Sequence, residues 1–210
     1  MTAPHAAHAS DAGNHGNPRT ISLYAAACQV LRHPRSGWGA IAARPHSASA
    51  LIMRLILPGS LVSALAVTAG ITWFNRDWHD DFGYSAPASQ ALSIGFATLA
   101  LSALYALVLA GVFTLTGKMY RSRGSYVQAL LLVAYGTLPV WIAGAFMFLM
   151  PAALLGMLAF VYACLIYSQG AHAVLGIAES ETTEFVAISL LLAALVMTVL
   201  SMMASALHMV

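Results

Sequence analysis

Long apolar runs separated by short polar segments dominate the chain, and the longest run defines its organisation. Residues 126–177 contain no Asp, Glu, Lys or Arg. A transmembrane helix needs only about 20 apolar residues, so this run is long enough to cross a bilayer twice. Proline suits the first turn of a helix and disrupts a helix interior, so Met150-Pro151 predicts the turn. The pattern therefore predicts a membrane hairpin over 126–150 and 151–174.

Three further apolar runs, residues 50–74, 88–116 and 185–207, are each long enough for one more span. The predicted fold class is therefore all-α: a polytopic membrane protein whose five-helix transmembrane domain occupies residues 47–210. In the last span, mostly small and polar residues with a heptad spacing predict the face that packs on its neighbours. These residues are Ala187, Leu191, Ala194, Thr198, Ser201, Ser205 and His208.

The region before the spans divides into two predicted parts. Residues 1–19 are rich in Ala, His, Gly and Asn without an apolar period, which predicts a disordered, His-rich tail. Residues 20–46 predict an amphipathic cytoplasmic segment that Pro34 divides. Its apolar residues at helical spacing are Ile21, Tyr24, Cys28 and Leu31, then Trp38 and Ile41. Such a segment lies at the membrane surface or packs on the helix bundle, and the sequence leaves both open.

Composition and charge agree with this class and add an orientation. Hydrophobic residues make up 60% of the sequence and charged residues only 8%, against about 25% charged in a soluble domain. The net charge of +2 gives no indication of nucleic-acid binding. Of the 9 basic residues, all but Arg76 lie on the same side of the predicted spans as the N-terminus. The positive-inside rule then predicts a cytoplasmic N-terminus and an external C-terminus; the alanine-rich composition favours a bacterial inner membrane.

Polar residues inside the predicted spans are the first candidate site, because such groups either bond to one another or mark a pathway. The candidates are Gln128, Tyr135, Pro139, Tyr162, Gln169 and His172. Pro139 removes the backbone hydrogen bond to the Tyr135 carbonyl, which then needs another donor in the membrane. Gln169 or Tyr162 on the neighbouring span is the expected donor.

Basic residues on the predicted cytoplasmic side are the second candidate. They predict a face for anionic lipid or for an acidic protein partner. The residues are Arg32, Arg35, Arg44, Lys118, Arg121 and Arg123.

Neither a metal site nor an enzyme motif is predicted. The segment after the first span contains Asp77, His79, Asp80 and Asp81, which are able to ligate a divalent cation. A solvated loop beside an interfacial tryptophan is the favoured interpretation of this segment. The chain contains no phosphate-binding loop, zinc-protease motif or nucleophile elbow. We therefore expect no catalytic residue, no metal site and no cofactor.

Four short sequences resemble a known family. They are Leu-Arg-His-Pro at 31–34 followed by Trp38, Ala-Tyr-Gly-Thr-Leu-Pro at 134–139, the segment 162–167, and Leu-Gly-Ile-Ala-Glu-Ser at 175–180. Together they resemble the Yip family of five-span membrane proteins (Ypt/Rab-interacting proteins), in its bacterial branch. The resemblance implies a five-helix bundle with a cytoplasmic N-terminus. In eukaryotic relatives it implies contacts with Rab-type GTPases and roles in vesicle traffic.

Two functions are consistent with this sequence. One is a non-enzymatic membrane scaffold or adaptor that acts through its cytoplasmic face on lipid, a protein partner or a second copy of the chain. The other is a channel or transporter for a small solute or ion. A continuous cavity lined by Gln128, Tyr135, Gln169 and His172 favours transport, whereas a packed bundle favours the adaptor.

Overall fold

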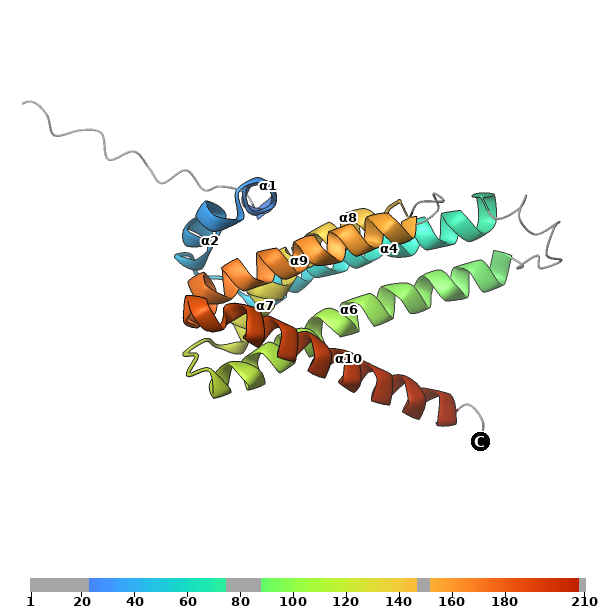
Figure 1. The fold of residues 1–210 in the computed structure, drawn as a ribbon. Helices are drawn as coiled ribbons and strands as arrows, with labels where there is room; N and C mark the ends of the chain where they lie inside the picture. The colour runs from blue at the N-terminus through green and yellow to red at the C-terminus, as the bar shows by residue number, and fades with distance from the viewer. Residues whose placement is uncertain (1–22, 75–87, 147–151, 208–210) are drawn as a thin grey trace, which may run out of the picture.

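The computed structural model describes residues 23–74, 88–146 and 152–207, and every element within them is a helix (Figure 1). The predicted tail and the Asp77–Asp81 segment lie outside these residues. Five helical stretches are long and apolar enough to cross a membrane, which confirms the predicted class. They are Ala48–Thr72, Ser89–Met119, Tyr126–Gly144, Leu154–Leu175 and Glu179–Met203.

The first span changes its helical geometry at a proline. It consists of α3 (Ala48–Leu51), a π-helical turn (Ile52–Ile56), α4 (Leu57–Ala69) and a second π turn (Gly70–Phe74). Pro58 lies two residues after the end of the first π turn, and a proline ring cannot fit against the carbonyl four residues earlier in a regular α-helix. The wider turn accommodates that ring.

The second span, α6 (Ala88–Met119), packs closely along α4. A methyl group on Gly95 would lie only 1.9 Å from the Thr68 hydroxyl oxygen, so the two helices approach at a small residue. Thr68 satisfies its own hydroxyl by donating to the Ala64 carbonyl, 2.9 Å away within α4.

The third span lies at the centre of the bundle and is broken. α7 (Tyr126–Gly136) and α8 (Leu138–Gly144) meet at Thr137, two residues before Pro139. Every residue of α7 from Ala129 to Gly136 is buried. Two thirds of this span's apolar window is buried, compared with a third or less for each of the other spans. The third span therefore forms the core on which the others assemble.

The last two spans are α9 (Ala152–Leu175) and α10 (Thr182–Leu207), joined by a short 3-10 helix, Glu179–Glu181. α9 packs on α7 and α8, as predicted for the hairpin, whereas α10 diverges from α9 along its length (Figure 1). The predicted packing face of α10 is wrong, because Leu191 is 73% exposed and Phe185, Val186, Ser189 and Ala193 are buried instead.

Two short N-terminal helices, α1 (Leu23–Arg32) and α2 (Pro34–Ala42), lie against the bundle. α1 runs across the spans rather than along them (Figure 1). Trp38 of α2 is completely buried, with its ring against Gly170 of α9. The segment therefore packs on the bundle, the second of the two predicted arrangements. The predicted face of α1 is wrong, since Cys28 is exposed and the buried residues are Ala26, Ala27 and Val30.

Candidate functional site

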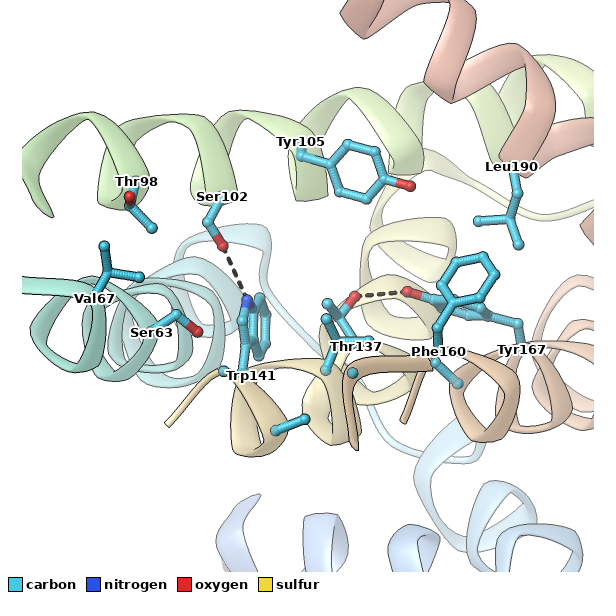
Figure 2. A pocket seen from close by; sticks show the side chains of 15 residues that line it. Ser63, Val67, Thr98, Ser102, Tyr105, Thr137, Trp141, Phe160, Tyr167 and Leu190 are labelled. Atoms are coloured by element: carbon cyan, nitrogen blue, oxygen red, sulfur yellow. Dashed lines mark hydrogen bonds between the residues drawn. The ribbon is translucent and has the colours of Figure 1, made fainter. Parts of the chain in front are cut away.

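A cavity of about 270 Å³ lies inside the bundle, among all five spans (Figure 2). α6 packs on α4, α7 and α10, whereas α9 packs on α7, α8 and α10, so α6 and α9 flank the cavity without extensive contact. The lining residues are Ser63, Val67, Thr98, Ser102, Tyr105, Thr137, Val140, Trp141, Ala143, Gly144, Gly156, Phe160, Ala163, Tyr167 and Leu190. The lining is apolar and aromatic with several hydroxyl groups, and none of these residues is charged.

Trp141 of α8 forms one wall and is fixed from two sides. Its indole Nε1–H donates a 3.0 Å hydrogen bond to the Ser102 hydroxyl on α6. Its ring lies against Gly59 of α4, where a methyl group would come within 2.3 Å of a ring carbon. Gly59 therefore leaves the space that Trp141 fills, and α4, α6 and α8 together set the orientation of the indole.

A pair of hydroxyl groups forms the floor of the cavity at the break between α7 and α8 (Figure 2). Thr137 Oγ1 lies 2.6 Å from the Tyr167 hydroxyl of α9 and donates to the Val133 carbonyl at 2.8 Å. Because the threonine proton is used in that second bond, Tyr167 is the donor to Thr137. The Tyr167 and Phe113 rings pack perpendicular to each other, with 5.4 Å between their centroids. The pair therefore joins α7 to α9 in the interior of the bundle.

Two further hydroxyl groups lining the cavity have no hydrogen-bond partner among the described residues: Ser63 on α4 and Tyr105 on α6. Figure 2 shows Tyr105 projecting from α6 toward the side of the cavity that holds the Thr137–Tyr167 pair. A hydroxyl is both a donor and an acceptor, so the cavity offers hydrogen bonds without charge.

None of the six intramembrane residues singled out from the sequence lines this cavity. Gln128 forms a capping box at the start of α7, where its Oε1 accepts from the Ser125 N–H at 2.7 Å. The Tyr162 hydroxyl donates to the Leu31 carbonyl and so fastens α1 to α9. His172 Nδ1 donates to the Ile177 carbonyl at 2.8 Å, at the end of α9. These three side chains satisfy backbone groups at helix ends.

The prediction that Gln169 or Tyr162 donates a hydrogen bond to the Tyr135 carbonyl is wrong. Tyr162 bonds to Leu31 instead, and Gln169 Oε1 is buried with no partner among the described residues. The Tyr135 hydroxyl and the Trp38 indole nitrogen are also buried without a hydrogen-bond partner among the described residues. Their rings pack edge to face, with 6.1 Å between the centroids. The proline break is stabilised by Thr137 and Tyr167 rather than by a glutamine.

Comparison with known proteins identifies the family of this bundle. The model of the Yip1 domain matches residues 28–201. The chain belongs to the Yip1 domain family. No curated protein and no solved structure matches the chain. The Yip1 match begins within α1, so the N-terminal helices and the five spans belong to one family unit.

The second predicted site lies at one end of the Yip1 domain, here called the charged end: the turn 120–125 between α6 and α7 and the segment 176–181 between α9 and α10. α6 ends there in a Schellman motif, since the Ser122 N–H donates to the Gly117 carbonyl at 2.9 Å and the Arg121 N–H to Lys118 at 3.3 Å. Arg121 has a φ of 55°, in the left-handed region.

The turn that carries Arg121 is tied to the end of α9. The Ser122 hydroxyl donates to the Leu175 carbonyl at 2.7 Å and accepts from the Gly124 N–H at 3.0 Å. Lys118 in the last turn of α6 is exposed, as are Arg121 and Arg123 on the turn itself and Arg32 and Arg35 on α1 and α2. Arg44 differs, because it is half-buried and close enough to Tyr135 to interact electrostatically.

Acidic residues of the Yip1 domain stand beside this basic turn. Glu179, Glu181 and Glu184 are exposed on the segment that leads into α10. Desolvation, together with the neighbouring Glu184 and Glu181 carboxylates, raises the pKa of Tyr120, the residue before Arg121. Within the described ranges no three His, Cys, Asp or Glu residues gather as a metal site. The charged end thus presents a basic patch, Lys118, Arg121 and Arg123, beside an acidic patch, Glu179, Glu181 and Glu184.

Proposed function

We propose that this Yip1-domain protein is a non-enzymatic membrane scaffold or adaptor that acts through its charged end in membrane organisation or trafficking. The observation that carries the proposal is the conformation of Arg121. A non-glycine residue in the left-handed region costs about 1–2 kcal/mol. Such strain is concentrated at functional positions, so an arginine held there supports a role for its side chain outside the fold.

A comparison within the molecule supports this interpretation. α9 ends at the same end of the bundle with Gly176, whose φ of 69° is unstrained for glycine. Arg121 lies two residues after the end of α6, and its φ of 55° is also positive. Glycine would close the α6 turn at lower cost, so the fold alone does not account for the arginine.

The bilayer gives the charged end an orientation. By the positive-inside rule the exposed basic residues of this end face the cytoplasm, and the C-terminus lies on the opposite side of a bacterial inner membrane. Each basic residue near an anionic leaflet contributes about 1 kcal/mol of attraction. The basic patch suits anionic lipid or an acidic partner, and the adjacent glutamates restrict which partner fits.

The channel hypothesis is less well supported by the geometry. Gln128 and His172 bond to backbone groups, and Tyr135 is completely buried. The third span, which contains Gln128 and Tyr135, is the most buried of the five. These side chains therefore line no continuous polar route among the described residues.

The test compares Arg121→Lys with Arg121→Gly. Lysine keeps the charge and the strain, whereas glycine removes both, so a loss of function in the glycine variant cannot be attributed to a weakened fold. Each full-length variant is purified from native membranes, and its retained lipids and proteins are identified. We expect Arg121→Gly to lose anionic lipid or a protein partner that Arg121→Lys keeps, with an unchanged or higher unfolding temperature. Equal retention by both variants would contradict the proposal.

A further inference from the structure

We propose that the intramembrane cavity is a binding site for a neutral, membrane-soluble molecule whose ring carries hydrogen-bond-accepting oxygens, the chemistry of a quinone head group. This goes beyond the adaptor role, which rests on the charged end. Three properties of the cavity support this assignment: its lack of charge, its donors without a partner among the described residues, and its aromatic walls.

The absence of charge limits the ligand to a neutral molecule. No lining residue is acidic or basic, and an ion moved into such surroundings loses its hydration without gaining a counter-charge. Phosphate and carboxylate groups are therefore poor occupants. The donors present are hydroxyl groups, which suit carbonyl or ether oxygens.

The depth of the donors argues against a lipid tail. Tyr105 lies about four helical turns from the charged end of α6, or roughly 20 Å along its axis, within a hydrocarbon layer about 30 Å thick. An acyl chain has no acceptor to offer at that depth and would leave the Tyr105 and Ser63 hydroxyls unsatisfied, which is unfavourable in a membrane. A ring with acceptor oxygens that dissolves in the bilayer satisfies them.

The walls are suited to a flat ring. Tyr105, Trp141, Phe160 and Tyr167 line the cavity from three helices. Trp141 and Tyr167 are held by the bonds to Ser102 and Thr137, so these walls exist before any ligand binds. Phe160 is 49% exposed, so this wall of the cavity extends to the outer surface of the spans, where lipid lies.

Two probes separate hydrogen bonding from simple apolar filling. Decylubiquinone carries ring oxygens, whereas decylbenzene has a similar tail and a ring without oxygen. Binding of each to the full-length protein in lipid nanodiscs is measured by quenching or calorimetry. We expect decylubiquinone to bind at least tenfold more tightly than decylbenzene, and Tyr105→Phe to remove that advantage. Equal binding of both probes, or binding of neither, overturns the proposal.

A matched pair of glycine variants tests whether the ligand binds in this cavity. A Cβ atom added at Gly156, a lining residue, meets no atom within 4 Å, and one added at Gly111, outside the lining, also meets none. Gly156→Leu should abolish decylubiquinone binding and Gly111→Leu should leave it unchanged, with both unfolding temperatures recorded. If Gly156→Leu fails to fold, Gly156→Ala replaces it in the test. We expect Gly156→Ala to lower the affinity for decylubiquinone several-fold. Undiminished binding in a folded Gly156 variant contradicts the assignment.

Discussion

At the scale of single residues, the bond between Thr137 and Tyr167 stabilises the break in the central span. We expect Thr137→Val and Tyr167→Phe each to lower the free energy of unfolding, because each removes one partner of a buried 2.6 Å contact. A double-mutant cycle should give a coupling of about 0.6–2 kcal/mol, the range for hydrogen bonds between membrane helices. Additive effects of the two substitutions would show that the hydroxyls do not stabilise one another.

Gln169 and Gln128 provide a second prediction at this scale. Gln169 Oε1 is buried without a partner among the described residues, so Gln169→Leu should be neutral or stabilising. Gln128→Leu removes the capping-box bond to Ser125 and should cost about 0.5–1 kcal/mol. Unfolding of both variants in the same detergent provides the comparison. A larger loss for Gln169→Leu than for Gln128→Leu would be evidence that the amide has a partner.

The sequence predicted some of these residue roles but not the cavity. Thr137 and Tyr167 lie within the segments that carry the family resemblance, yet a hydroxyl in an apolar span gives no signal of the helix it faces. The capping box was predictable, because Ser125 precedes Gln128 by three residues at a helix start. The cavity depends on α6 and α9 lying apart, which no local pattern encodes.

At the scale of elements, the α1–α2 pair depends on a close approach at one glycine. A methyl group on Gly170 would lie 2.4 Å from Leu132 and 2.6 Å from the Trp38 ring, so Gly170→Ala should displace Trp38 and loosen α2. Faster tryptic cleavage after Arg32 or Arg35 in the solubilised protein would report that loosening. Gly39→Ala, also on α2 but facing open space, is the control and should change nothing. Identical digestion of the two variants would contradict the assigned packing.

The number and order of the spans were predictable, whereas their inward faces were not. Length and apolar content alone determine that a segment crosses the bilayer. Lipid and the interior of a helix bundle are both apolar, so polarity does not reveal which side of α10 packs inward. This is why Phe185 and Ser189, rather than Leu191, form the buried face. The break at Thr137 was only partly foreseen, since Pro139 predicts a lost backbone bond but not two separate helices.

At the scale of the whole molecule, the charged end and the intramembrane cavity differ in charge. Basic and acidic patches stand together at the charged end, and the intramembrane cavity lies deeper, among all five spans. Surface attraction to an anionic leaflet weakens with salt, since the Debye length is about 8 Å at physiological ionic strength. Retention of anionic lipid by the wild-type protein should therefore fall as salt is raised, while decylubiquinone binding should not. A salt-independent lipid association would show that the basic residues do not drive it.

The most direct test of the account is whether the charged end faces the cytoplasm. Ser180 is exposed at that end, and Val210 is the last residue of the sequence, beyond α10. Ser180→Cys and Val210→Cys are made separately with Cys28 and Cys164 replaced by serine, and intact spheroplasts are treated with a membrane-impermeant maleimide. We predict that Val210→Cys is labelled and that Ser180→Cys reacts only after the membrane is permeabilised. Labelling of Ser180→Cys in intact spheroplasts, with Val210→Cys protected, would place the charged end outside and contradict the account.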